Sequence, residues 1–198
     1  DRQVEFGRAA RGGLMSADEL KAGALANPAN RELLARLPQL GLSQCYLVAG
    51  CLYQAVWNQQ GGRAPDWGVK DYDIFYYDDE DLGWDAEDRV IKAAEALVAD
   101  LRIIVEPRNQ ARVHLWYASR FGEGYPRLMS SEDAIGRYLV TCTCVGISVE
   151  TGEVCAPYGF DELERGALRM NPVNARPEHF RAKAESYAAR WPWLRILD

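Results

Sequence analysis

Long apolar runs, paired cysteines and an excess of basic residues are all missing from this sequence of 198 residues. No run approaches the roughly 20 apolar residues needed to span a bilayer, and the first residues lack the apolar core of a signal peptide. The five cysteines show neither the C-x-x-C pairs of a zinc ribbon nor the pattern of a secreted disulfide framework. We therefore expect reduced thiols, a cytoplasmic location and no membrane contact.

The charge balance is acidic. Lys and Arg number 23 against 29 Asp and Glu, which gives a formal net charge of −6 and a pI near 5.1. An extended nucleic-acid surface needs clustered basic side chains, so the composition argues against long DNA or RNA as a partner. A small anionic ligand is still compatible with the sequence if a metal ion accompanies it. With 48% hydrophobic residues the chain can bury one substantial core, and we expect a single domain over residues 1–198.

Two helices are predicted before the first strand. Ser16 and Glu19 have the spacing of a capping box, which opens a helix. Asn27 and Pro28 have the residue types of an N-cap and of the first helical position that follows it. We interpret residues from about 16 to 38 as a helical N-terminal extension of the domain.

Apolar spacing and turn residues define the next elements. A short apolar run that ends in glycine is typical of a buried strand, and a following glycine pair ends a helix. The predicted elements are a strand at 45–49 that ends at Gly50, a helix at 51–60, a strand at 71–77, and a helix capped by Asp85 that runs to about residue 100.

From residue 101 onward, the sequence alternates short apolar runs with residues typical of helix N-caps. Two of these runs flank the turn residues Pro107–Gln110 and are interpreted as strands. The predicted elements are strands at 101–106 and 112–117, a helix capped by Ser130 and Asp133, a hairpin turning at Thr151 and Gly152, a short helix opened by Asp161 and Glu164, and a last helix from near Pro177. This order predicts an α+β fold with a mixed β-sheet flanked by helices, and a helical C-terminal extension at about 160–198.

Two aspartates one residue apart lie in the strand predicted at 71–77. Side chains alternate between the faces of a strand, so Asp71 and Asp73 share one face while Tyr72 points into the core. Carboxylates side by side repel one another unless a cation lies between them. Mg²⁺ is usually held by one or two carboxylates with substrate phosphates completing its octahedron. The pair therefore indicates a metal-assisted phosphoryl-transfer site, although a solvated edge strand is the more common explanation of an isolated D-x-D.

A glycine turn precedes the two aspartates. The predicted strand ends at Gly50, and Cys51 opens a helix whose free N–H groups and positive dipole end favour an anion. Close packing would also explain a glycine at this position. The turn and the D-x-D strand together indicate nucleotide phosphates more strongly than either feature does alone.

Four longer segments carry a family resemblance. They are AGCLYQAVWNQQ at 49–60, GVKDYDIFYYDDEDLGWDAEDRVI at 68–91, EPRNQARVHLWYASRFG at 106–122 and CAPYGFDEL at 155–163. Over roughly residues 42–171 the chain resembles the bacterial nucleotidyltransferase-like family, formerly a domain of unknown function, of the nucleotidyltransferase β superfamily. In that superfamily a Gly-Gly or Gly-Ser turn precedes a strand bearing Asp-x-Asp, and here Cys51 stands where Ser is usual. The resemblance implies the nucleotidyltransferase fold, and it implies no particular acceptor.

The resemblance also implies a third metal-binding carboxylate on a later strand. In the matching slot, between Val113 and Leu115, the sequence has His114, whose imidazole suits Zn²⁺ or Mn²⁺ better than Mg²⁺. Glu106 is the other candidate, because it ends the preceding predicted strand and supplies a hard oxygen ligand. We favour Glu106 and keep His114 as the alternative third ligand.

Other polar residues near these positions are candidates for binding the nucleotide. Lys70 lies beside the aspartates and could contact a triphosphate or pair with surface acids. Arg108 and Asn109 could hold a phosphate, and salt-bridge and turn roles explain them equally well. The predicted nucleotide-binding residues are Gly50, Cys51, Lys70, Arg108 and Asn109.

Two hypotheses for function follow. The first is a nucleotidyltransferase that uses Mg²⁺ or Mn²⁺ and moves a nucleoside monophosphate from an NTP to an unidentified small-molecule or protein acceptor, with Asp71, Asp73 and Glu106 at the metal. The second is a catalytically inactive relative that binds a nucleotide or a protein partner as a sensor. Turnover would separate the two.

Overall fold

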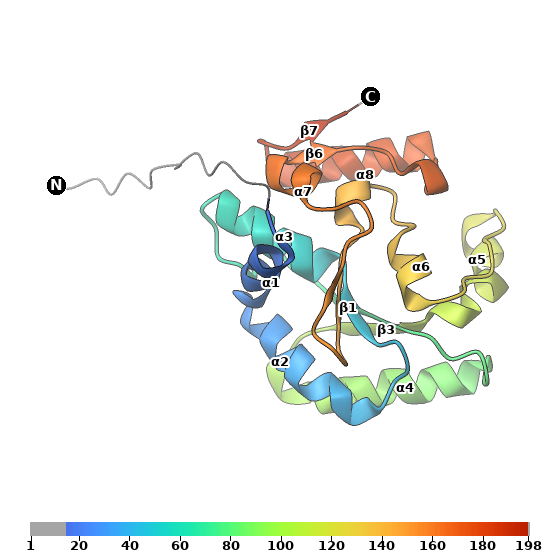
Figure 1. The fold of residues 1–198 in the computed structure, drawn as a ribbon. Coiled ribbons are helices and arrows are strands. Elements are labelled where there is room, and N and C mark those ends of the chain that lie inside the picture. The colour runs from blue at the N-terminus through green and yellow to red at the C-terminus, as the bar shows by residue number, and fades with distance from the viewer. Residues whose placement is uncertain (1–14, 198) are drawn as a thin grey trace.

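A mixed sheet forms the centre of the protein. The computed structural model describes residues 15–197 and contains a five-stranded sheet in the order β3-β2-β1-β4-β5, together with a small sheet of β6 and β7 (Figure 1). The helices are α1 (Ala17–Leu25), α2 (Pro28–Arg36), α3 (Gly50–Gln60), α4 (Trp84–Leu97), α5 (Val113–Phe121), α6 (Ser131–Ile135), α7 (Asp161–Arg165) and α8 (Pro177–Arg190). The strands are β1 (Tyr46–Val48), β2 (Tyr72–Tyr76), β3 (Val105–Asn109), β4 (Gly146–Ser148), β5 (Val154–Cys155), β6 (Ala167–Leu168) and β7 (Arg195–Ile196). The predicted α+β class is confirmed.

The large sheet contains both parallel and antiparallel pairs. β1 is antiparallel to β2 and β4, and β4 is antiparallel to β5. β2 and β3 run parallel, and α4, which connects them, packs against β3. This parallel register places Asp73 of β2 directly opposite Glu106 of β3.

The two faces of β2 have different surroundings. Residues along the strand alternate between buried and half-buried positions, with Tyr72 on the buried face and Asp73 and Phe75 on the other. The Tyr72 hydroxyl accepts a hydrogen bond from Asn27, the N-cap of α2, over 3.2 Å. On the other face the Phe75 ring stacks on Tyr138. Figure 1 shows α4 and α8 on opposite sides of the sheet, and the half-buried face is the one that is turned toward α8.

Most helices begin at the predicted caps. The Ser16 capping box is formed, Asn27 caps α2, and Ser130 caps α6. The N-cap of α4, however, is Gly83, and Asp85 lies in the first turn instead of capping the helix. An acid in the first turn still stabilises the positive end of the helix dipole.

The prediction of two strands around Pro107–Gln110 is wrong. The structure has one strand here, β3, which includes Pro107. Proline is tolerated because β3 lies at the edge of the sheet, where one side of the strand needs no ladder hydrogen bonds. The segment Val113–Phe121 is helix α5, which ends at Gly122 with a φ of 76°. Apolar side chains recur in it at helical spacing, which a short apolar run does not distinguish from a strand.

The predicted hairpin is confirmed as β4 and β5, with Gly152 in its turn at a φ of 70°. Cys142 belongs to a 3-10 turn at Thr141–Thr143 ahead of β4. Cys142 and Cys144 are buried, and all five cysteines are free thiols.

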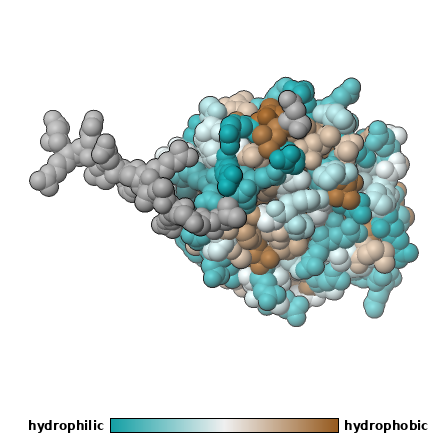
Figure 2. Space-filling view, turned by 45° about the horizontal axis from the view of Figure 1, so that its top comes forward, coloured by the Kyte–Doolittle hydropathy of each residue, from teal (hydrophilic) through white to brown (hydrophobic). Residues whose placement is uncertain are grey.

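The surface is largely hydrophilic. Figure 2 shows one face on which hydrophobic residues form small separate patches. Exposed large apolar side chains such as Trp84, Ile104 and Met129 belong to different parts of the chain. Within residues 15–197, no helix has the length and apolar character that a membrane crossing requires.

Candidate active site

Three carboxylates gather on the half-buried face of the sheet. Asp71 immediately precedes β2, and Asp73 is the second residue of that strand. Glu106 lies opposite Asp73 in the parallel register, so its side chain is on the same face. The negative charges of Asp71 and Glu106 both act on Asp73. The structure therefore places Asp71, Asp73 and Glu106 on one face of the sheet, and their role at a metal stays a prediction.

Asp73 is the acid most affected by its surroundings. Burial is the largest effect and raises the pKa of Asp73 from an ordinary 3.8 to about 7, and the charges of Asp71 and Glu106 add to the rise. The positive charges of Arg108 and Lys183 oppose it. A carboxylate that is this costly to ionise is stabilised by a cation that binds it.

The chain offers Asp71 and Asp73 no hydrogen-bond donor or ion-pair partner within residues 15–197. In the same part of the chain, no group of three or more His, Cys, Asp or Glu side chains is arranged so that it could hold a metal ion. Mg²⁺ does not require such a preformed set, because one or two carboxylates suffice when substrate phosphates supply other ligands. The hard oxygen donors of Asp71 and Asp73 therefore fit Mg²⁺ or Mn²⁺ bound together with a phosphate ligand.

A strained turn leads from β1 into α3. Ala49 has a φ of 56° and a ψ of −122°, a conformation that residues with a Cβ atom rarely adopt. The turn is held by a hydrogen bond from the Ala49 amide to the Val145 carbonyl, over 3.0 Å. α3 then begins at Gly50, so the amides of Gly50 and Cys51 lie at the helix N-terminus, where no intrahelical acceptor reaches them. These amides are available to an anion.

Cys51 contributes its backbone to this site and not its thiol. The side chain is buried, and its Sγ donates to the carbonyl of Val48 over 3.5 Å. Burial is the largest cause that raises the pKa of the Cys51 thiol well above its ordinary value, and the charges of Asp73 and Asp71 also raise it. The thiol is therefore neutral and turned into the core, and the N-terminus of α3 lies beside the two aspartates.

Two cationic side chains from distant parts of the chain oppose the acidic charges. Arg108 shares a face of β3 with Glu106, and its Nη2 is 3.8 Å from Glu106 Oε2. Lys183 belongs to α8, and its Nζ is 5.3 Å from the ring centroid of Tyr187. Both charges lower the pKa of Asp73. Sequence reasoning missed Lys183, because no local pattern indicates that α8 packs over this face of the sheet.

Tyrosine hydroxyls border the N-terminus of α3. The hydroxyls of Tyr53 and Tyr187 are both buried and are 2.5 Å apart. A Cβ atom built on Gly50 would lie 3.9 Å from the Tyr53 hydroxyl and 3.0 Å from Gln54 Nε2. Burial raises the pKa of Tyr53, and the charge of Asp73 adds to the rise. Glycine at position 50 therefore leaves room between these polar groups and the helix amides.

Two residues predicted to bind the nucleotide, Lys70 and Asn109, differ in their surroundings. Lys70 is exposed in the segment before β2. Asn109 lies opposite Tyr76 on the buried face of the sheet. Its side chain accepts hydrogen bonds from the amides of Asp78 and Ala111 and donates to the Asp78 carbonyl. Because these bonds fix the ends of β2 and β3, we leave Asn109 out of the proposed site.

His114 is not on a strand, and the prediction that placed it there is wrong. It is the second residue of α5, and its Nδ1 atom is buried without a hydrogen-bond partner in the described part of the chain. The slot that made it a candidate for the third metal ligand belongs to a strand, and position 114 is helical here. Glu106 lies opposite Asp73 on the neighbouring strand and remains the favoured candidate for the third ligand.

A sheet in which a strand-turn-helix unit is followed by an Asp-x-Asp strand, with a further acid on the neighbouring strand, is the arrangement of a nucleotidyltransferase fold. A family model described as nucleotidyltransferase matches residues 35–196. The chain therefore belongs to this nucleotidyltransferase family, which confirms the resemblance found in its motifs. No functionally curated protein matches the chain by sequence.

A solved structure of TM-score 0.71 shares this fold. It is an NMR structure described as revealing a CCA-adding enzyme head domain, with 21% sequence identity over 92% of this chain and 96% of that chain. Another is a tRNA-processing enzyme in an apo form, with a TM-score of 0.48 and 15% identity over 92% of this chain and 45% of that chain, a similarity too low to support an inference. The first likeness shows the fold.

Proposed function

We propose that this protein transfers a nucleoside monophosphate from an NTP to an acceptor, with Mg²⁺ or Mn²⁺ as the metal. The observation that carries the proposal is the half-buried carboxylate of Asp73, which lies beside Asp71 and Glu106 and has no hydrogen-bond donor in the part of the chain that the structure describes. Membership of a nucleotidyltransferase family supports a transferase.

Asp71 and Asp73 would hold the metal ion, and Glu106 is the candidate third ligand. When bound, the ion would orient the triphosphate and lower the pKa of the attacking hydroxyl. Burial is the main cause of the raised pKa of Asp73, and the charges of Asp71 and Glu106 add to it; a divalent cation bound there would offset both effects. Ionisation of Asp73 and metal binding therefore favour each other.

The remaining groups of the site would bind phosphate. The amides of Gly50 and Cys51 face an anion from the positive end of α3, while Arg108 and Lys183 supply charge from β3 and α8. In the reaction the acceptor oxygen forms a bond to the α-phosphorus, the bond from that phosphorus to the bridging oxygen breaks, and pyrophosphate leaves. Positioned donors and cations stabilise the charge that develops on these oxygens.

The acceptor that we propose is a small molecule or a protein side chain. The net charge of −6 disfavours an extended contact with RNA. The similar head domain is described as that of a CCA-adding enzyme, and at 21% identity its likeness concerns the fold and not the acceptor.

Thermal denaturation with each of the four NTPs tests the donor site. The melting temperature should rise with an NTP and Mg²⁺ and should not rise in EDTA, because the metal joins the carboxylates to phosphates that would otherwise repel them. Asp71→Asn and Asp73→Asn should lose this shift while staying folded. Asp79→Asn, which changes an exposed acid beyond β2, is the matched control and should keep it.

Incubation with α-labelled NTP, metal and a metabolite extract tests turnover. Labelled product together with released pyrophosphate is the expected result. Equal stabilisation by NTP in EDTA would contradict the metal site. Tight metal-dependent binding without pyrophosphate release with any acceptor would favour the inactive sensor instead.

A further inference from the structure

The hydroxyl of Tyr138 is buried and unpaired. Its Oη atom has no hydrogen-bond partner in the described part of the chain. Buried hydroxyls nearly always have a hydrogen-bond partner. A buried hydroxyl without one has lost its hydrogen bonds to water, and this loss lowers the stability of the fold. An unpaired hydroxyl beside a candidate active site therefore points to a group that binds there.

Tyr138 lies over the acidic face of the sheet. Its ring stacks on Phe75 with centroids 5.8 Å apart and planes 14° apart, and Phe75 shares the half-buried face of β2 with Asp73. Burial is the largest cause that raises the pKa of Tyr138 well above its ordinary value, and the charge of Asp73 is the next. The stacking therefore places Tyr138 on the face of the sheet that carries Asp73, and its phenol carries the proton that a hydrogen-bond donor needs.

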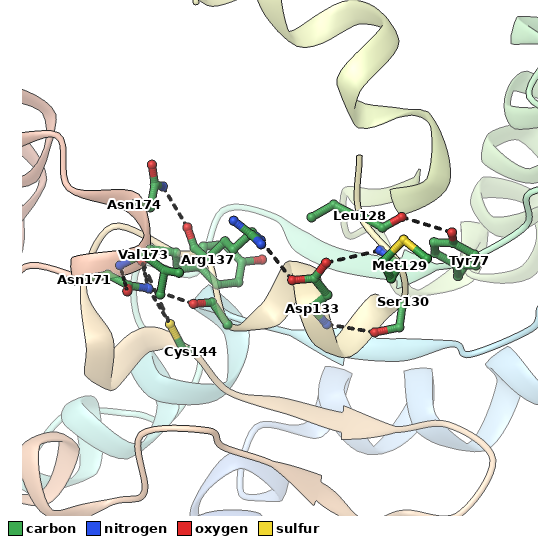
Figure 3. Close-up of polar contacts among 12 residues, drawn as sticks. Tyr77, Leu128, Met129, Ser130, Asp133, Arg137, Cys144, Asn171, Val173 and Asn174 are labelled. Carbon is green, nitrogen blue, oxygen red and sulfur yellow. Dashed lines mark hydrogen bonds and ion pairs between the residues drawn. The ribbon is translucent and has the colours of Figure 1, made fainter. Parts of the chain in front are cut away.

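The side-chain amides of Asn171 and Asn174 hold the backbone around Tyr138, and Figure 3 shows both amides beside Arg137. Asn171 is fully buried, and its Nδ2 donates to the carbonyls of Gly136 and Tyr138, each over 2.8 Å. Asn174 Nδ2 donates to the carbonyl of Arg137 over 2.7 Å. These hydrogen bonds pair the carbonyl groups of Tyr138 and of the two residues before it, and none of them involves the Tyr138 hydroxyl. A side chain whose backbone is held in this way is preorganised for a ligand.

We infer that Tyr138 is a substrate-binding residue, whose hydroxyl donates a hydrogen bond to a phosphate oxygen of the nucleotide held at Asp73. The inference rests on the proposed function. Phosphate is the matching chemistry because the phenol is a donor, the neighbouring turn offers two further N–H donors, and a cation held by Asp73 attracts phosphate oxygens to the same place. Contact with the sugar or the base is a separate outcome of the test.

Tyr138→Phe removes the hydroxyl and keeps the ring that stacks on Phe75. Without nucleotide, the variant should melt about 2 °C or more above the wild type, because an unpaired buried polar group is gone. With Mg²⁺ and NTP it should bind about tenfold or more weakly than the wild type, because a hydrogen bond to a charged oxygen is lost. A variant that melts at a higher temperature and yet binds NTP more weakly is not expected if the residue only supports the fold.

Tyr77→Phe is the matched control. The Tyr77 hydroxyl is also buried, but it donates to the carbonyl of Leu128 over 3.0 Å. Its removal should lower the melting temperature, because the carbonyl loses its partner, and should leave the affinity for NTP unchanged.

Two probes, each with Mg²⁺, identify the group that Tyr138 contacts. If the contact is a phosphate, Tyr138→Phe should weaken binding of both NTP and inorganic tripolyphosphate. Weakening for NTP alone would place the contact on the sugar or base and would overturn the inference.

Two further results would overturn it while the proposed function stands. They are unchanged NTP affinity in Tyr138→Phe, and a melting temperature of the free variant below that of the wild type, which would show that the hydroxyl has a partner within the fold. Absence of Mg²⁺-dependent NTP binding by the wild type would overturn both the inference and the proposed function.

Discussion

Asp73→Asn should stabilise the metal-free protein, and more so as the pH rises. The pKa of Asp73 in the fold is about 7 against an ordinary 3.8, so the folded state holds this proton more tightly than the unfolded state does. Between these two values the folded state binds more protons, and the free energy of unfolding therefore falls as the pH increases. The loss of stability caused by ionising Asp73 is absent at pH values below its ordinary pKa and complete at pH values above its pKa in the folded state. An amide carries no such penalty.

The gain in stability of Asp73→Asn follows from the difference between the two pKa values of Asp73. A rise of about 3 pKa units corresponds to about 4 kcal/mol when the carboxyl is ionised in both states, and to about 1.5 kcal/mol at pH 5, where only the unfolded state is ionised. Solvent reaches part of the Asp73 side chain, so we expect about 2–4 kcal/mol at pH 8. In a protein of this size that is a rise of about 5–10 °C in melting temperature.

Urea denaturation in EDTA at pH 5 and pH 8 measures this difference. Wild type, Asp73→Asn and the control Asp79→Asn are compared, and only Asp73→Asn should gain stability that grows with pH. A gain of equal size at both pH values would refute the reasoning, because Asp73 would then titrate normally. A loss of stability at pH 8 would show that the carboxylate has a stabilising partner in the fold.

Two further predictions concern the third acid and a buried ion pair. Glu106→Gln should reduce the rate of pyrophosphate release by about 100-fold and change NTP affinity little, because the two aspartates still bind the metal. His114→Ala should reduce this rate much less. If rate assays give the reverse ranking, the third ligand is His114. Glu87→Ala should cost about 3 kcal/mol or more in urea denaturation, because it leaves the buried Arg112 guanidinium without its ion-pair partner. A cost below about 1 kcal/mol would contradict the importance of that pair.

The elements that the sequence predicts correctly depend on short-range chemistry. The Ser16 capping box and the Asn27 cap are formed within a few residues of each other, so residue type and spacing are sufficient. The shared face of Asp71 and Asp73 follows from the two-residue period of a strand. These features are fixed before any tertiary contact is considered.

The elements that the sequence predicts wrongly are those whose secondary structure depends on their position in the tertiary fold. Pro107 suggests a turn, yet it fits a strand at the sheet edge, and nothing local shows that β3 is the edge. The run that contains His114 is apolar enough for a buried strand or a helix. Its helical form places His114 outside the sheet, which is why Glu106 is the better candidate.

Lys183 and Tyr138 could not be found from the sequence, because their relation to Asp73 exists only after packing. Lys183 lies on a helix far along the chain from β2, and Tyr138 lies in an irregular segment between α6 and β4. Neither position carries a motif. An irregular segment is nevertheless a common location for binding residues on a rigid scaffold.

The packing of α8 connects the turn before α3, the proposed phosphate site, with the carboxylates. Tyr187 of α8 shares a hydrogen bond with Tyr53 of α3, while Lys183 of the same helix opposes the negative charge around Asp73. Without α8, Asp73 would face two acids with Arg108 as the main opposing charge, and the buried hydroxyl of Tyr53 would lose its hydrogen bond to Tyr187. A phosphate bound between α3 and α8 would be contacted from both helices, so nucleotide binding and the docking of α8 stabilise each other. The C-terminal helix is therefore part of the proposed site, although it lies far from the Asp-x-Asp strand in sequence.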